Sequence, residues 1–252
     1  MVILIPARIS SSRLKEKPLL DLCGIPMIVR VAKRALMCST SVYVCTDSVK
    51  VVDVCRSYGI SALLTDSNHQ TGTDRLAQAA TMLGLSDDEI VVNLQGDEPL
   101  MPVEALELVS QLLIDNSTAD IATLGHPISC FEDFISPNVV KVIVNRNNEA
   151  LYFSRAPIPY PRDTFNSGNI KPVCALHHLG IYAYRMKFLR EYKDLLSPDL
   201  ENLEKLEQLR ALYYGYKIQV GVIDKMLPPG VDTAEDLYRV RTILSEECKI
   251  SC

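Results

Sequence analysis

The chain has 252 residues, of which 48% are hydrophobic and 23% charged, and its formal net charge is −5. This composition suits a globular protein with a substantial core, either one large α/β domain or a core domain with an inserted lobe. The acidic balance argues against a nucleic-acid footprint spread over the surface, and no apolar run approaches the roughly 18 residues of a membrane span, so neither membrane insertion nor a signal peptide is expected.

The first half of the chain alternates predicted strands and helices. Strands are predicted at 2–5, 41–47, 62–65 and 89–97. Apolar residues at helical spacing predict helices over 28–36, after Ser48, over 76–83 and over 103–114. This rhythm predicts a mainly parallel sheet with helices on both faces.

The second half is predicted to have mixed strand directions. Strands at 139–145, 150–154 and 177–185 are separated by loops rich in Pro, Asn and Gly. Helices at about 186–193 and 203–213, a strand at 218–223 and a helix at 233–244 complete the chain. Neither repeats nor a linker are visible.

The eight cysteines do not indicate a metal site or disulfides. They lie at positions 23, 38, 45, 55, 130, 174, 248 and 252, without a Cys-x-x-Cys pair. We interpret them as free thiols in a reducing cytosol.

A cation-rich stretch, "PARISSSRLKEKPL" at 6–19, directly follows the first predicted strand. Ligands of open α/β sheets bind beyond the carboxyl ends of the strands. Serine hydroxyls, backbone N–H groups and cations at such an end suit a phosphate chain, although neither a P-loop nor a dinucleotide fingerprint is present. We favour a functional role for Arg8 and Lys17, and a solvated surface role for Lys15.

Two acidic segments indicate a metal site. In "QGDEP" (95–99), Asp97 and Glu98 follow a buried strand, where carboxylates suit magnesium; a turn aspartate that caps the next helix is the alternative. In "GVDTAEDL" (230–237), Asp232 and Thr233 precede a helix, so at least one of them should be an N-cap. Two strand-end aspartates beside a cationic loop are best explained jointly, by a nucleotide–metal site.

Taken in order, these segments and several others resemble one family. The set comprises the opening stretch, "GIPMI" (24–28), "TD" (46–47), "HQTGTDRLAQA" (69–79), "NLQGDEPL" (93–100), "YFSRAPIP" (152–159), "HHLGIYAYR" (177–185), "LEQLRALYYG" (206–215) and "GVDTAEDL" (230–237). It is similar to the 3-deoxy-manno-octulosonate cytidylyltransferases, or CMP-Kdo synthetases, from about residue 2 to residue 244.

The resemblance implies transfer of CMP from CTP to the sugar acid 3-deoxy-manno-octulosonate (Kdo) with release of pyrophosphate, for lipopolysaccharide synthesis. It implies a nucleotide-diphospho-sugar transferase (Rossmann-like) fold, Mg²⁺ dependence, a cytoplasmic location and a homodimer. We expect a single domain over 1–252, with a smaller inserted mixed β/α lobe for sugar binding and dimerisation at about 128–215.

The resemblance also implies the roles of particular residues. The catalytic residues would be Arg8, Lys17, Asp97 and Asp232, and the two aspartates would hold the metal. Ala7, Ser11 and Thr73 would join Arg8 and Lys17 at the nucleotide. The sugar would contact Arg75, Gln95, Arg155, His178, Tyr182, Glu207 and Gln208. The chain departs from the family at Lys15–Glu16, where Pro-Gly is usual, so an easy positive-φ position is lost and an anion is added.

One histidine at most is expected in the sugar site. His177 and His178 are adjacent in a predicted strand, so at most one of them faces the site. His126 is interpreted as structural and His69 as a possible loop contact.

Alternative functions are a cytidylyltransferase for sialic acid or an amino-Kdo, a metal-dependent glycosyltransferase of similar fold, or a non-catalytic nucleotide-binding module.

Overall fold

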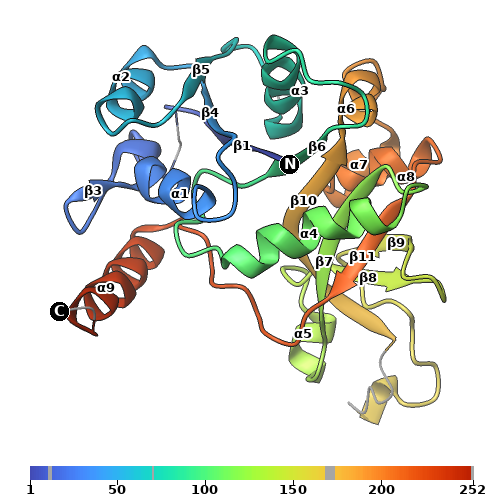
Figure 1. Cartoon of the computed structure of the whole chain (residues 1–252). Helices are drawn as coiled ribbons and strands as arrows, with labels where there is room; N and C mark the ends of the chain where they lie inside the picture. Colours follow the sequence, from blue (N-terminus) through green and yellow to red (C-terminus); the bar gives the residue numbers. More distant parts are fainter. Residues whose placement is uncertain (11–12, 70, 168–173, 251–252) are drawn as a thin grey trace. The chain divides into compact units, whose positions relative to one another are not determined.

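The computed structural model describes residues 1–10, 13–69, 71–167 and 174–250, with side chains described as far as residue 246. The chain divides into two compact units, one formed by Met1–Glu107 with Leu227–Cys252 and the other by Leu108–Met226 (Figure 1). The second unit contains the whole of the expected insert at 128–215, and begins and ends outside that range.

The first unit is built on a parallel sheet in the order β6–β1–β4–β5. Its strands are β1 (Val2–Ala7), β4 (Val42–Thr46), β5 (Ala62–Leu64) and β6 (Ile90–Asn93). Its helices are α1 (Met27–Ala35), α2 (Val49–Ser57), α3 (Gly72–Met82) and α9 (Ala234–Ile250), and α4 (Val103–Asp115) runs across the boundary of the units. A 3₁₀ turn, η1 (Lys17–Leu19), and a hairpin of β2 (Asp21–Leu22) and β3 (Ile25–Pro26) follow β1.

Helices cover both faces of this sheet, as expected. Ile3, Leu4 and Ile5 are all fully buried although successive side chains of a strand point to opposite faces. Crossovers between parallel strands are right-handed, so α1 and α2, which lead outward along the sheet, lie on one face. The connection through α3 returns to the other side of β1 and therefore lies on the opposite face.

The second unit has mixed strand directions, which confirms the expectation for the second half of the chain. The strands, in the order β11–β7–β10–β8–β9, pair antiparallel except for β11 and β7. They are β7 (Ile121–Pro127), β8 (Lys141–Val144), β9 (Ala150–Ser154), β10 (Ala175–Arg185) and β11 (Ile218–Val222). Its shorter elements are α5 (Phe131–Ile135), η2 (Phe165–Ser167), α6 (Met186–Tyr192), α7 (Asp199–Glu204) and α8 (Gln208–Tyr213).

Three predictions about elements were wrong. Strand β7 was not predicted, although every residue from Ile121 to Leu124 is buried. The single helix predicted at 203–213 is two helices, because Lys205 adopts a left-handed conformation with φ +54° and ends α7. The last helix continues past residue 244 to Ile250.

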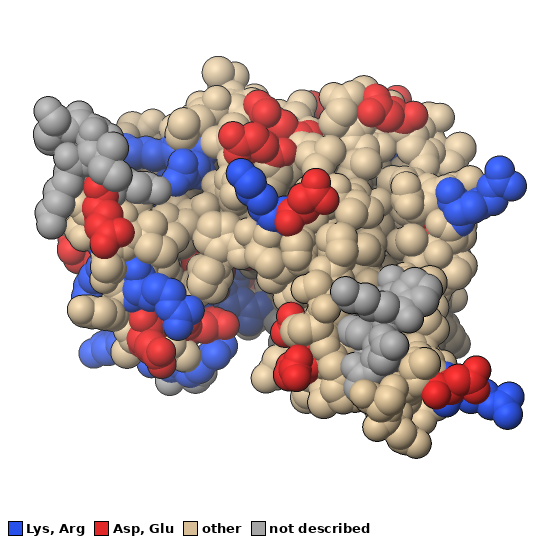
Figure 2. Space-filling model, turned by 90° about the horizontal axis from the view of Figure 1, so that it is seen from below, with Lys and Arg blue, Asp and Glu red and all other residues tan. Residues whose placement is uncertain are grey.

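The described helices and the face drawn in Figure 2 bear on membrane and nucleic-acid binding. Within the described ranges, every helix is too short or too polar to cross a bilayer. Figure 2 shows Lys and Arg side chains interspersed with Asp and Glu over the face that it draws. Such mixing does not favour nucleic-acid binding on that face.

Candidate active site

A pocket of about 290 Å³ lies in the first unit at the carboxyl ends of β1 and β6. It is formed by the end of β1, the cation-rich stretch, the loop after β6 and the segment before α9. Its lining residues are Pro6, Ala7, Arg8, Ser10, Arg13, Lys17, Pro18, Met27, Gln95, Gly96, Asp97 and Asp232. All four residues predicted to be catalytic are therefore in one pocket.

Close backbone packing brings the two aspartates to this pocket. A Cβ on Gly96 would lie 2.8 Å from the carbonyl oxygen of Pro6, so only glycine lets the loop after β6 approach β1 this closely. The Val231 N–H donates to the carbonyl oxygen of Asp97 at 2.8 Å, which places the next residue, Asp232, beside Asp97. Segments that are far apart in the sequence are thus joined by main-chain contacts.

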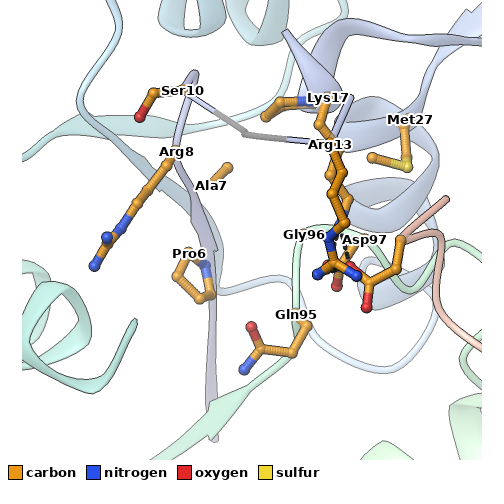
Figure 3. A pocket seen from close by; sticks show the side chains of 12 residues that line it. Pro6, Ala7, Arg8, Ser10, Arg13, Lys17, Met27, Gln95, Gly96 and Asp97 are labelled. Carbon is orange, nitrogen blue, oxygen red and sulfur yellow. Dashed lines mark hydrogen bonds and ion pairs between the residues drawn. The ribbon is translucent and has the colours of Figure 1, made fainter. Parts of the chain in front are cut away.

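Lys17 lies between the two carboxylates. Its Nζ is 2.6 Å from Asp97 Oδ2 and 3.0 Å from Asp232 Oδ1, and Arg13 Nη2 reaches the same Asp232 oxygen at 3.2 Å. Burial by itself lowers the pKa of Lys17, but the hydrogen bonds and charges of Asp97 and Asp232 outweigh it, so the pKa is raised and the ammonium stays charged. Figure 3 shows Arg13 and Lys17 on the same side of the pocket as Asp97, whereas the Arg8 side chain points away from them.

Thr233, rather than Asp232, caps helix α9. Its Oγ1 accepts the Asp236 N–H at 3.2 Å, and Asp236 Oδ2 accepts the Thr233 N–H at 2.9 Å, which is a reciprocal capping arrangement. These contacts lower the pKa of Asp236, first through its hydrogen bond with the Thr233 side chain. The carboxylate of Asp232 faces Lys17 and Arg13 instead. The sequence left open whether Asp232 or Thr233 is the N-cap, and the structure shows that it is Thr233.

Glu16 stands at the position where the family that the sequence resembles usually has glycine. It adopts the left-handed conformation, with φ +49°, that a glycine would take without strain. Its carboxylate is 2.7 Å from Lys50 Nζ, and this hydrogen bond is the main cause of its lowered pKa. The added anion is therefore paired with Lys50 and does not bond to Lys17.

Three other predicted site residues of the first unit, Arg75, Thr73 and Gln95, can be placed in the structure. Arg75 is fully buried, with Nη1 bonded to Thr65 Oγ1 at 2.5 Å and Nη2 to Asp47 Oδ2 at 3.3 Å, while its Nε has no hydrogen-bond partner among the described residues. Burial is the main cause that lowers its pKa. Thr73 is buried in the first turn of α3, and Gln95 lines the pocket. Ser11 lies outside the described residues.

In the second unit, His178 and Tyr182 are brought together by an irregularity in β10. The register with β7 jumps between Leu179 and Tyr182, and the two rings lie 5.5 Å apart, although four residues of regular strand would separate them by about 13 Å. His177 pairs with Lys141 in the sheet, whereas His178 packs edge-on against Phe153, which is on the other face. The two histidines therefore face opposite sides, as predicted.

His178 is neutral in this setting. Burial, with a smaller effect of His177, lowers its pKa to about 3. The Thr123 hydroxyl is within hydrogen-bond distance of the carbonyls of Leu179 and Ile181 and lies 3.0 Å from His178 Nε2. Because a hydroxyl has one proton and the carbonyls can only accept, we assign the Nε2–H tautomer, which leaves Nδ1 as an acceptor.

Glu207 and Gln208 are also placed in this unit, at the start of α8. Burial and the charge of Glu207 are among the causes that raise the pKa of Tyr182, which places that carboxylate near the phenol. The side-chain Nε2 of Gln208 and the hydroxyl of Tyr192 are buried without a partner among the described residues. Unpaired buried donors are costly and are typical of a site that a polar ligand completes.

Arg155, at the end of β9, is held by backbone oxygens. Its Nε donates to the carbonyl of Glu204 at 2.8 Å and its Nη1 to that of Pro137 at 2.9 Å. It is the cation of the second unit's predicted sugar-binding set. Of the other two histidines, His126 bonds the Ile223 carbonyl through Nδ1 at 3.0 Å and is structural, and His69 contacts Gln78 at 2.7 Å.

Comparison with known proteins identifies the family. The family model described as cytidylyltransferase matches residues 2–218. A 3-deoxy-manno-octulosonate cytidylyltransferase of Francisella tularensis subsp. novicida is 48% identical over 244 residues, which are 96% of this chain and 98% of the relative. One of Neisseria gonorrhoeae is 45% identical over 246 residues, covering 96% of this chain and 97% of the relative.

The chain belongs to the 3-deoxy-manno-octulosonate cytidylyltransferase family.

Solved structures agree with this family assignment. A structure of CMP:2-keto-3-deoxy-manno-octonic acid synthetase complexed with CTP is 42% identical, covers 98% of both chains and superposes with a TM-score of 0.89. A cytidylyltransferase of Leptospira borgpetersenii, at 17% identity and a TM-score of 0.61, covers 97% of this chain and 86% of its own, and shows the shared fold alone. The nucleotidyltransferase fold predicted from the sequence is confirmed.

The sequence interpretation did not single out Arg13, which lines the pocket of the first unit and pairs with Asp232. Its only signal was its place in the cation-rich stretch, where it could not be told from a solvated arginine. It also missed Glu204 and Lys141, which surround Arg155 and belong to no recognisable motif.

Proposed function

We propose that this chain transfers CMP from CTP to Kdo and releases pyrophosphate, supplying an activated sugar acid for lipopolysaccharide synthesis. The observation that carries the proposal is the likeness, at 42% identity and a TM-score of 0.89, to a synthetase of this kind solved with CTP. The reaction is attack of the anomeric hydroxyl of Kdo on the α-phosphorus of CTP. One P–O bond forms, the bond to the β-phosphate breaks, and the hydroxyl proton is released to solvent.

The first unit would bind the triphosphate. Lys17 and Arg13 line the pocket as cations, and charge-assisted hydrogen bonds from such groups to phosphate oxygens offset the mutual repulsion of the phosphates. Transfers of this type depend mainly on positioning and on stabilising developing charge. No covalent nucleophile on the protein is required.

The second unit would contribute recognition of the sugar acid. Arg155 provides a guanidinium for the Kdo carboxylate, whereas His178, which stays neutral, can only exchange hydrogen bonds with hydroxyls. Tyr182, Glu207 and Gln208 would bind the remaining hydroxyls. Sialic acid and amino-Kdo differ from Kdo in their substituents, so they remain the alternatives to be tested.

Asp97 and Asp232 fit a magnesium ion. Their oxygens Oδ2 and Oδ1 both lie within 3.0 Å of one ammonium nitrogen, so the two carboxylates already converge on a single cation. Carboxylate oxygens are the ligands that Mg²⁺ prefers. The described residues hold no group of three or more His, Cys, Asp or Glu that could bind a metal, so two carboxylates would have to share the ion with substrate phosphates and water. When bound, the ion would neutralise phosphate charge and lower the pKa of the attacking hydroxyl.

We further infer that the protein works in the cytoplasm and as a homodimer. A cytoplasmic location is supported by the availability of CTP in that compartment and by the reduced cysteines that the sequence predicts. The homodimer is supported by the family resemblance, and sedimentation at several protein concentrations would test it.

The decisive experiment is pyrophosphate release across a panel of nucleotides and sugar acids, with and without Mg²⁺. We expect release only with CTP, Kdo and the metal together. Release with sialic acid or amino-Kdo but not Kdo would change the substrate. Binding of CTP without release for any sugar acid would indicate a non-catalytic module, and consumption of a nucleotide sugar without pyrophosphate would indicate a glycosyltransferase.

A further inference from the structure

Glu204 forms three hydrogen bonds with Arg155 and the preceding residue, Ser154. Its Oε2 accepts the main-chain N–H of Arg155 at 2.9 Å, and its carbonyl oxygen accepts Arg155 Nε at 2.8 Å. Its other carboxylate oxygen, Oε1, accepts the Ser154 hydroxyl at 2.5 Å. Both the backbone and the guanidinium of Arg155 are thus attached to one residue.

Lys141 holds the opposite side of Arg155. Its side chain is fully buried, and Nζ donates to the carbonyls of Ser136 at 2.8 Å, Val139 at 2.6 Å and Arg155 at 2.7 Å. An ammonium has three N–H groups, so its donors are fully used. The loop that it ties down includes Pro137, whose carbonyl accepts Arg155 Nη1 at 2.9 Å.

These contacts leave one edge of the guanidinium for a ligand. Arg155 has five N–H groups, of which the Nε–H and one on Nη1 are engaged by carbonyls. Among the described residues, none bonds to Nη2. The remaining N–H groups on Nη1 and Nη2 form the edge that can bind a carboxylate through two hydrogen bonds.

Glu204 is also close in the sequence to two other predicted sugar-binding residues, Glu207 and Gln208. It is the last residue of α7, and Lys205 follows with φ +54° and reverses the chain before Glu207 and Gln208 begin α8. The residue that is bonded to Arg155 is therefore followed within four positions by Glu207 and Gln208.

We propose that Glu204 is a positioning residue for the sugar acid, which presets Arg155 so that its free edge receives the carboxylate without reorganisation. The inference rests on the proposed function. Fixing a binding group beforehand removes the entropy that would otherwise be lost on binding, and a misplacement of about 1 Å can cost as much as a hundredfold in rate.

Steady-state kinetics of three variants test the proposal. Glu204→Ala removes the side-chain contacts, and we expect the KM for Kdo to rise at least about tenfold while the KM for CTP changes less than about twofold. Glu204→Gln should recover most of the wild-type KM, because its amide oxygen can accept the Arg155 N–H and its NH₂ can donate to Ser154 Oγ. The matched control is Glu201→Gln on the same helix.

Glu201 is a suitable control because it stabilises α7 without touching Arg155. Its carboxylate oxygens lie 2.6 and 2.7 Å from Arg210 Nη2 and Nε, and the residue is buried. Glu201→Gln should lower the melting temperature as Glu204→Ala does, yet leave the ratio of the two KM values at the wild-type level. A similar rise of the Kdo KM in the control would mean that Glu204 is merely structural.

A double-mutant comparison shows whether Glu204 acts through Arg155. In an Arg155→Ala background, Glu204→Ala should raise the Kdo KM by no more than about twofold further. Additive effects would overturn the proposal. Absence of Kdo turnover in the wild type would instead refute the proposed function. A normal Kdo KM in Arg155→Ala would refute the assignment of Arg155, and with it the positioning role of Glu204, while the proposed function would stand.

Discussion

The ammonium of Lys17 donates to Asp97 Oδ2 at 2.6 Å, in the position between two carboxylates where a divalent cation would bind. Lysine and metal ion would therefore compete for the same oxygens in the free protein. When CTP binds, the phosphates offer the ammonium an alternative partner, so nucleotide and metal should bind cooperatively.

The first prediction is that removing this ammonium strengthens metal binding. Without CTP, Lys17→Met should bind Mn²⁺, used as a probe for Mg²⁺, about fivefold more tightly in calorimetry, or about 1 kcal/mol. Arg13→Met removes a cation that, among the described residues, pairs with Asp232 and not with Asp97, and Lys15→Met removes an exposed one, so both should have smaller effects. Weaker metal binding by Lys17→Met would show that the lysine does not compete.

Lys17 should also distinguish CTP from CMP. Charge-assisted hydrogen bonds contribute about 1.5–3 kcal/mol each, and CMP lacks the β- and γ-phosphates, so wild type should bind CTP at least about tenfold more tightly. Lys17→Ala should reduce that ratio more than Lys15→Ala does, as measured by titration of both nucleotides. An unchanged ratio in Lys17→Ala would make the lysine a structural partner of the aspartates only.

Asp232 and Thr233 should separate activity from stability. Asp232→Ser removes a proposed metal ligand but leaves the cap of α9 in place, so turnover should fall at least about a hundredfold with the melting temperature near that of wild type. Thr233→Ala removes the cap and should lower the free energy of unfolding by about 1 kcal/mol while the folded protein stays active. Retained activity in Asp232→Ser would return this aspartate to a surface role.

Glu16 can be tested through its backbone and its charge. Glu16→Gly places at φ +49° the residue that tolerates this conformation best, and the lost carboxylate bonds Lys50 rather than Lys17. We expect the affinity for CTP to hold or improve by calorimetry. Glu16→Gln keeps the strained backbone and removes only the charge, so a loss of affinity in the glycine variant alone would mean that rigidity of this turn matters.

His178 should make the protein less stable in acid. Its pKa is about 3 when folded against an ordinary value of 6.5, so between these values the unfolded state binds more protons and the free energy of unfolding falls as the pH falls. From pH 7 to pH 5 this group should account for a loss of about 2 kcal/mol. Urea unfolding at both pH values should show a smaller loss in His178→Asn; equal losses would mean that His178 is protonated when folded.

The separate elements of the first unit could be read from the sequence because their signals are local. Apolar spacing predicted β1 and α1, and the side chain of Ser48 accepts the Val51 N–H at 3.4 Å as an N-cap should. The break at Lys205 could not be predicted in this way. A left-handed conformation at a lysine depends on the contacts around it, and the spacing of apolar residues across 203–213 is compatible with an unbroken helix.

The sequence by itself determined the family and the residue types of the site, because the motifs that carry the chemistry are short, contiguous and in a fixed order. The tertiary structure decided which groups meet: that Lys17 bonds both aspartates, that Arg13 also reaches Asp232, and that Glu16 pairs with Lys50. These partners are far apart in the sequence, and Lys17 and Asp232, for example, are separated by 215 positions. Such contacts depend on where the ends of parallel strands converge and on backbone approaches such as that of Gly96 to Pro6, which no local pattern encodes.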